Sequence, residues 1–376
     1  MAFRNICGFE TGNASEAFQA LGTYSIQSTT KRTGNYALRV NPVTTGTGYF
    51  SLAGLAATGG IGDIGSTETY MAFYFRVAAA PAANDEEFAL LNLSGSPNNN
   101  NALRLTSGRV IKFYSGDGTT LIATGSTVLA LDTWYRIELW IGSGDGAGAT
   151  DNYELRINGA TEFSGTMQFG GAGATAVAFY LGKVNNKNGQ SVDFYYDDVA
   201  VSNSGWVGHG KVSILKPNGA GSYTDWTGTY ADVDEVPHDS DTTYLTSSTS
   251  GQAETVALDS AATSGVDGAI GTVKAVAIVR DEGGASAIQV RLRSGTTDSD
   301  TTSADPGTSY VALCKMYDVN PADSAAWESA DIDGIEAGVE NNASVAARCT
   351  AIYAMVWSTG QVASKPFRKT LLGVGF

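Results

Sequence analysis

Short runs in which apolar and polar residues alternate recur along most of this sequence, while helical periodicity almost never persists. In the clearest run, residues 134–141, four apolar side chains fall on one face, and Arg136 and Glu138 fall on the other. A period of two is the pattern of a β-strand with one buried face. The chain is therefore predicted to be all-β.

A second alternating run, residues 153–157, leads directly into Asn158 and Gly159. This dipeptide favours a type I′ turn, so a return strand is expected at residues 161–163. Further strands are expected at residues 69–77, 87–93, 109–114, 177–182 and 192–201. Turn residues separate these runs at the spacing of a β-sandwich.

The composition changes after Val201, where residues 202–205 and 208–210 form a short joint rich in Gly and Ser. Beyond the joint, strands are expected at residues 272–279, 288–293, 310–317 and 346–357, and one short helix near residues 321–327. We therefore predict two β-sandwich domains. The first spans residues 1–205, and the second spans residues 206–376, with polar loops and a basic C-terminal tail.

The hydrophobic fraction of 43% is sufficient for packed cores. A net charge of −15 repels nucleic acid phosphates and anionic membranes, so no nucleic acid partner is expected. No apolar run is long enough for a membrane helix, and residues 1–10 lack the hydrophobic segment of a signal peptide. Synthesis in the cytoplasm without a signal peptide and no membrane insertion are expected.

The three cysteines, Cys7, Cys314 and Cys349, lie far apart and make an odd count. No C-x-x-C spacing indicates a zinc site or a disulfide framework. A bridge between Cys314 and Cys349 stays open, but buried free thiols are favoured because both residues lie in apolar strand patterns.

Known catalytic motifs are absent from the sequence. The two histidines, His209 and His238, have no G-x-S-x-G partner, and no phosphate-binding glycine motif occurs. Glycosidases need two carboxylates across a sugar cleft, and Asp197 and Asp198 would point to opposite faces of a regular strand. The expectation is no catalytic residue and no bound cofactor.

An acidic loop offers candidate metal ligands in Asp232, Asp234, Asp239 and Asp241, whose oxygens could bind Ca²⁺. The loop lacks the glycine and the distal Glu of an EF-hand, so a solvated acidic loop is the favoured interpretation. Aromatic residues 194–196 could stack on sugar rings, although alternate members are needed in the core.

The first half resembles a concanavalin A-like (laminin G-like) jelly roll. The similarity lies in residues 9–12, 34–40, 134–138, 154–159 and 194–201, and it covers residues 1–205. It implies the fold, and it implies that Asp198 supports the backbone of the closing strand. The family includes lectins, glucanases and scaffolds, so the fold does not choose the function.

The second half resembles regions that accompany such jelly rolls in tailed-bacteriophage virion proteins. The similarity lies in residues 234–244, 273–293 and 332–339, together with Trp327. It implies a non-enzymatic structural protein on the exterior of a phage particle, as a capsid decoration or tail component with other virion proteins as partners. The alternative is a carbohydrate-binding module that attaches to a host-surface glycan, and a glycan hydrolase is third.

The C-terminal tail combines cations with apolar residues. We expect a homo-oligomer in which this tail docks on an acidic surface of a neighbouring subunit. The expected contact residues are Lys365, Phe367, Arg368, Lys369 and Leu371. The alternative is an end strand folded against its own domain.

Overall fold

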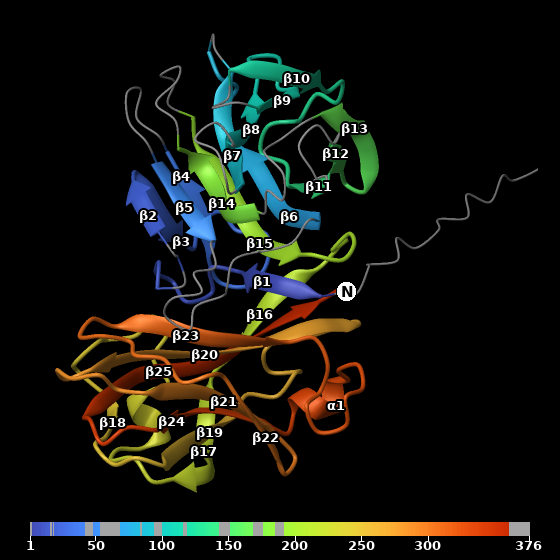
Figure 1. Ribbon diagram of the computed structural model, residues 1–376. Helices are drawn as coiled ribbons and strands as arrows, with labels where there is room; N and C mark the ends of the chain where they lie inside the picture. Colours follow the sequence, from blue (N-terminus) through green and yellow to red (C-terminus); the bar gives the residue numbers. More distant parts are fainter. Residues whose placement is uncertain are drawn as a thin grey trace, which may run out of the picture.

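The structure is a computed structural model that describes residues 2–15, 17, 19–41, 48–52, 68–82, 85–93, 100–115, 119–142, 151–167, 176–184 and 192–360. Its described strands form four antiparallel sheets (Figure 1). The all-β prediction is therefore confirmed. The short helix, α1 (Ser329–Ile332), begins two residues beyond the segment predicted for it, and η1 (Tyr230–Asp232) is a single 3₁₀ turn.

Two sheets come from the first half of the chain. Sheet A has the order β13 (Ala160–Met167), β12 (Asp151–Ile157), β11 (Tyr135–Gly142), β6 (Glu68–Val77), β15 (Phe194–Ser202), β4 (Ala37–Val40), β3 (Tyr24–Gln27), and β1 (Phe3–Cys7) also pairs with β15. Sheet B has the order β10 (Thr120–Thr124), β9 (Ile111–Ser115), β8 (Asn100–Leu105), β7 (Glu86–Leu93), β14 (Ala176–Lys183), β5 (Gly48–Leu52), β2 (Gln19–Gly22).

The predicted hairpin forms between β12 and β13. Asn158 and Gly159 both have positive φ, as a type I′ turn requires. The alternating residues of β12 then follow the prediction, with Tyr153 and Leu155 buried in the core between sheets A and B. An aromatic cluster at the centre of this core includes Phe75 and Phe88, whose ring centroids are 4.4 Å apart.

Two further sheets come from the second half. Sheet C has the order β16 (Lys211–Leu215), β25 (Ala347–Ser358), β20 (Ile270–Asp281), β23 (Val311–Tyr317), and β18 (Leu245–Ser247) also pairs with β25. Sheet D has the order β17 (Pro217–Thr224), β19 (Gln252–Leu258), β24 (Ile335–Asn341), β21 (Ile288–Ser294), β22 (Thr297–Asp300). A second core lies between sheets C and D.

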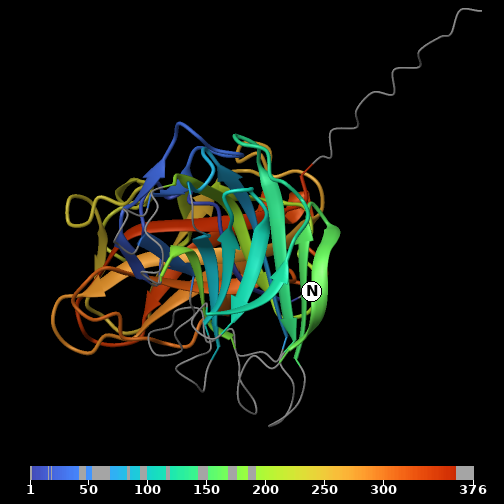
Figure 2. The ribbon, with the colours of Figure 1, turned by 90° about the horizontal axis from the view of Figure 1, so that it is seen from above.

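The four sheets stack in the order B, A, C, D, and sheets A and C share a third apolar cluster. Figure 2 looks down on this stack, so that the two halves overlap. In the cluster, Phe3 of β1 lies 6.1 Å from Trp357 of β25, measured between ring centroids. Lys274, only 2% exposed, donates to the carbonyl oxygen of Ile6 at 3.1 Å. Independent folding of residues 1–205 and 206–376 stays a prediction.

All three cysteines are buried thiols, the alternative that the sequence favoured for Cys314 and Cys349. Cys314 packs in the cluster between sheets A and C, whereas Cys349 packs in the core between sheets C and D. The two thiols therefore lie on opposite faces of sheet C. Among the described residues, no helix has the length and apolar character needed to cross a membrane.

Candidate functional site

The face of sheet B that points away from sheet A carries polar and aromatic side chains in rows set by the strand register. One row contains Ser51, Tyr180, Leu90, Ala102 and Tyr114. At the next positions Tyr49 lies opposite Gly182, and Glu87, Arg104 and Lys112 lie opposite one another. The side chains that alternate with them, such as Leu103 and Leu181, fill the core. This outer face of sheet B is our candidate site.

Arg104 is the central cation of the site and is only 5% exposed. Its Nη2 atom lies 3.8 Å from Glu87 Oε2, and its Cζ atom lies 4.5 Å from the ring centroid of Tyr114. Nη2 is buried and has no hydrogen-bond acceptor among the described residues. Because a buried donor without an acceptor costs free energy, this N–H group is suited to an acceptor supplied by a ligand.

A second charged group lies beside Arg104. Asp85 accepts hydrogen bonds from Lys112 Nζ at 2.9 Å and from the Tyr114 hydroxyl at 2.7 Å. The hydrogen bond to Asp85 raises the pKa of Lys112, and burial raises the pKa of Tyr114. At neutral pH the site therefore presents a cation at Lys112 and a neutral phenol at Tyr114.

Hydroxyl groups continue the site across β5 and β14. The rings of Tyr49 and Tyr180 meet edge to face, with centroids 5.2 Å apart. Ser51 is fully buried, and its Oγ atom has no hydrogen-bond partner among the described residues. The site thus combines aromatic rings, hydroxyl groups and two cations, a set that suits a polar ligand with acceptor groups.

A second aromatic group lies on the face of sheet A that points away from sheet B, next to the joint. Tyr70 of β6 and Trp140 of β11 stack with centroids 5.9 Å apart, and Trp206 meets Tyr70 edge to face. The guanidinium of Arg156 lies 3.8 Å from the Trp206 ring. All four side chains are half-buried, which makes this group the second place where a ligand could stack.

Asp197 and Asp198 do not follow the alternation expected of a regular strand. The register of β15 shifts between Asp197 and Ala200, and Asp198 has φ of 46°, so the strand contains a bulge. As a result both carboxylates bind one loop: Asp197 accepts from the Arg32 and Thr33 amides, and Asp198 accepts from their side chains. The expectation that these carboxylates point to opposite faces is wrong here.

These two aspartates also fasten the two halves together. Asp198 Oδ1 accepts from the Val212 amide of β16 at 2.7 Å, and the Arg32 guanidinium donates to the Gly210 carbonyl at 2.9 Å. Burial raises the pKa of Asp198, although Arg32 lies against it, and burial together with Asp198 raises the pKa of Asp197. The contacts are those of a structural junction between the two halves.

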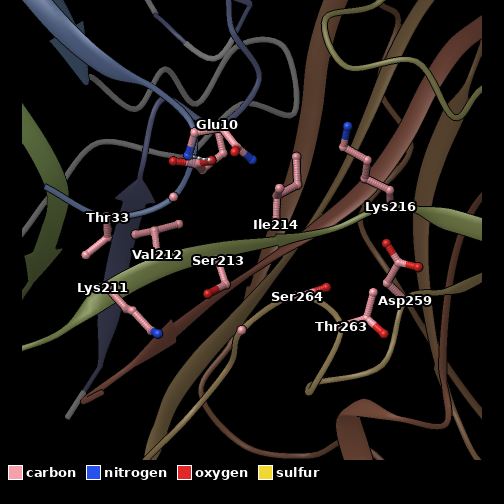
Figure 3. Close-up of a pocket in the computed structure, with 13 residues that line it drawn as sticks. Glu10, Thr33, Lys211, Val212, Ser213, Ile214, Lys216, Asp259, Thr263 and Ser264 are labelled. Carbon is pink, nitrogen blue, oxygen red and sulfur yellow. Dashed lines mark hydrogen bonds between the residues drawn. The ribbon is translucent and has the colours of Figure 1, made fainter. Parts of the chain in front are cut away.

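A cavity of about 310 Å³ lies between the two halves beside this junction (Figure 3). It is lined by Glu10, Thr33, Gly34, Asn35, Lys211, Val212, Ser213, Ile214, Lys216, Asp259, Thr263, Ser264 and Gly265. Glu10 is 4% exposed and accepts from the Asn35 amide at 2.8 Å. Burial raises the pKa of Glu10 from 4.5 to about 7.

The Glu10 carboxyl is expected to make stability fall as the pH rises. The pKa of Glu10 is higher in the folded chain than in the unfolded chain. Its contribution to the free energy of unfolding is therefore complete below about pH 4.5 and is lost as the pH rises through about 7. The total decrease in the free energy of unfolding is about 3 kcal/mol. Denaturant unfolding from pH 4.5 to 8 measures it, and Glu10→Gln should flatten the profile. A profile that Glu10→Gln leaves unchanged would contradict this assignment.

The four calcium candidates are not brought together. Asp232 accepts from the Thr229 amide at 2.7 Å and caps η1, and Asp239 binds the Thr243 hydroxyl at 2.9 Å. Hydrogen bonds from Arg280 and Tyr310 lower the pKa of Asp241 to about 2, and Asp234 is half-buried. Within the described ranges, no group of three or more His, Cys, Asp or Glu residues could hold a metal ion.

Two other predictions concerned the aromatic residues 194–196 and the subunit-contact residues of the C-terminal tail. Phe194 and Tyr196 are fully buried, so the closing strand uses them in the core, whereas Tyr195 lies half-buried under Arg76. The expected subunit-contact residues lie outside the described residues: Lys365, Phe367, Arg368, Lys369 and Leu371. The homo-oligomer therefore stays a prediction.

The candidate site could not be located from the sequence, because the pattern does not predict the strand at residues 100–105. The alternation was present, since Leu103 and Leu105 are apolar and flank Arg104. The run is short and bordered by asparagines, which are depleted in strands, and this weakened the signal.

No protein-family model and no curated protein matches this chain, but many solved structures do. The endo-beta-1,4-glucuronan lyase from Trichoderma reesei is 13% identical at a TM-score of 0.41, and the match covers 54% of this chain and 96% of the lyase. An alginate lyase from Aplysia kurodai is 8% identical at a TM-score of 0.42, covering 54% and 100%. A cellulose-induced protein is 14% identical at a TM-score of 0.38, covering 52% and 91%.

These comparisons agree with the predicted jelly-roll type of β-sandwich and correct the predicted function. The similar structures are mostly polysaccharide lyases, so two expectations drawn from the sequence, a non-enzymatic protein and a structural role on a phage particle, are contradicted. Identities of 8 to 15% concern the fold. The chemistry of this chain has to be argued from its own residues.

Proposed function

We propose that this chain binds a polysaccharide bearing carboxylate groups along the outer face of sheet B. The observation that carries the proposal is Arg104, a buried cation with an N–H group for which no described residue supplies a hydrogen-bond acceptor. A guanidinium binds a carboxylate through two parallel hydrogen bonds, which gives both strength and orientation. Lys112, directly opposite Arg104 on the neighbouring strand β9, supplies a second cation.

The rest of the face fits a sugar chain better than a simple ion. Tyr114 and Tyr180 are half-buried and offer part of their rings, and the buried Ser51 offers a hydroxyl group that no described residue binds. Aromatic rings stack on the apolar faces of sugars while hydroxyl groups bind their edges. The overall charge of −15 gives no general attraction for a polyanion, and Arg104 and Lys112 are each paired with a carboxylate, so recognition depends on directed hydrogen bonds from these two side chains.

Replacing Arg104 by Met is expected to weaken polysaccharide binding at least tenfold. The variant keeps an unbranched, flexible side chain but loses the charge and the hydrogen-bond donors. Glucuronan and alginate are the probes, measured by titration calorimetry with the whole chain. Arg104→Lys, which keeps the charge without the planar fork, should fall between the wild type and Arg104→Met.

Arg76→Met is the matched control, because Arg76 lies on sheet A of the same half and is ion-paired with Asp132 at 2.6 Å. Its affinity for both probes should match that of the wild type. Unchanged binding by a folded Arg104→Met variant would overturn the proposal. Loss of binding on Trp140→Ala instead would place the ligand on the aromatic group of sheet A. New reducing ends are assayed in the same mixtures, so that cleavage is recorded.

A further inference from the structure

The cavity between the two halves is a second polar site, separate from sheet B. Its walls come from the start of the chain, from the loop at residues 33–35, from β16 with Lys216, and from residues 259–265. In Figure 3, Lys216 and Asp259 lie near each other at one end of the cavity, and Glu10 lies across from them. The volume of about 310 Å³ is at the lower end of the range of ligand pockets, about 300–1,000 Å³.

Several lining groups have hydrogen-bonding capacity that the described residues do not use. The side chains of Lys216 and Asp259 make no hydrogen bond or ion pair within the described ranges, although their backbones bond to each other at 2.9 Å. The Oγ atom of Ser264 is buried and has no partner there. Lys211, in contrast, is paired with Asp267 at 2.6 Å. The unused groups thus include a cation, an anion and a hydroxyl.

The mixture of charges selects the kind of ligand. A simple anion would meet the carboxyl groups of Asp259 and Glu10, and a simple cation would meet Lys216. A hydroxyl group donates and accepts, so one polyhydroxylated ring can satisfy all of these groups at once. None of the described lining residues is aromatic, so the ligand would be held by hydrogen bonds and not by ring stacking.

We propose that this cavity binds a single neutral pyranose ring, through hydrogen bonds to Lys216, Asp259 and Ser264. Because both halves line the cavity, the ligand also holds them together and stabilises the junction. The long polysaccharide on sheet B and the single ring in this cavity are independent of each other.

The test blocks the cavity with a large side chain. Thr263 lines the cavity and is exposed, so Thr263→Trp fills the space at little cost to folding. Ala262, the preceding residue, is also exposed but does not line the cavity, which makes Ala262→Trp the matched control. The ligands are the methyl pyranosides of glucose, galactose and mannose, with inorganic phosphate as the ionic comparison. Binding to the whole chain is measured by saturation-transfer NMR and calorimetry.

At least one pyranoside is expected to bind the wild type and Ala262→Trp equally and Thr263→Trp at least tenfold more weakly. Arg104→Met should bind it as the wild type does, which separates this site from sheet B. The inference is overturned if no pyranoside binds the wild type, if Thr263→Trp binds as well as Ala262→Trp, or if phosphate alone occupies the cavity.

Discussion

Replacing Asp198 by Ala is expected to lower the free energy of unfolding by about 3–5 kcal/mol, the usual cost of leaving one member of a buried ion pair alone. Asp198 is fully buried and accepts from the Arg32 guanidinium, the Thr33 hydroxyl and the Val212 amide. The variant removes this acceptor from all three donors, and the Val212 amide is then left buried without it. Denaturant unfolding followed by tryptophan fluorescence measures the loss.

The control for this prediction lies at the start of the same strand. Asp193 is paired with Arg39 at 2.9 Å, but both side chains are partly exposed. Exposed pairs contribute about 0–1 kcal/mol, so Asp193→Ala should change stability little. Removing Arg32 as well, in Asp198→Ala with Arg32→Met, should recover part of the loss because no unpaired charge remains. Equal losses for Asp193→Ala and Asp198→Ala would show that the junction is not a buried pair.

The sequence predicted those parts of the fold that depend on local rules. Asn158 and Gly159 located the hairpin because few residues tolerate two positive φ angles in succession. The alternation in β11 and β12 gave their core-facing sides correctly, since the polar residues on the other face leave a clear period of two. Tyr153 and Leu155 are both in the core, as that period requires.

The stacking of sheet A on sheet C was not predicted, because it depends on contacts between distant strands. A signal was present in the strands that are buried on both faces. Residues 351–357 in β25 are apolar without interruption, and residues 199–201 in β15 repeat this on a smaller scale. Continuous apolar runs are typical of strands covered on both sides. The run in β25 indicated that another layer covers sheet C.

The bulge in β15 could not be read from the sequence. Asp197 and Asp198 look like neighbours on an ordinary strand, and only the shifted register brings both carboxylates to the loop at Arg32.

The candidate site on sheet B could not be predicted from the sequence for a related reason. Arg104 and Glu87 lie on strands that are adjacent in the sheet but separated in sequence, so their pairing depends on the register between β7 and β8.

Replacing Leu155 by Ala is expected to cost about 2–5 kcal/mol, because the smaller side chain leaves a cavity in a close-packed core. Leu155 is fully buried on β12 and packs in the core between sheets A and B. Asn152→Ala, on the exposed face of the same strand, is the control and should change the free energy of unfolding by less than about 0.5 kcal/mol. The measurement is the denaturant midpoint at a constant slope.

Trp134→Ala provides a second comparison for the stability loss of Leu155→Ala. Trp134 immediately precedes β11, is half-buried and is not part of the apolar core, so Trp134→Ala should cost less than Leu155→Ala although it removes a much larger side chain. Burial, and not the size of the side chain, would then determine the loss. A larger loss for Trp134→Ala than for Leu155→Ala would show that β11 and β12 are packed with the opposite face toward sheet B.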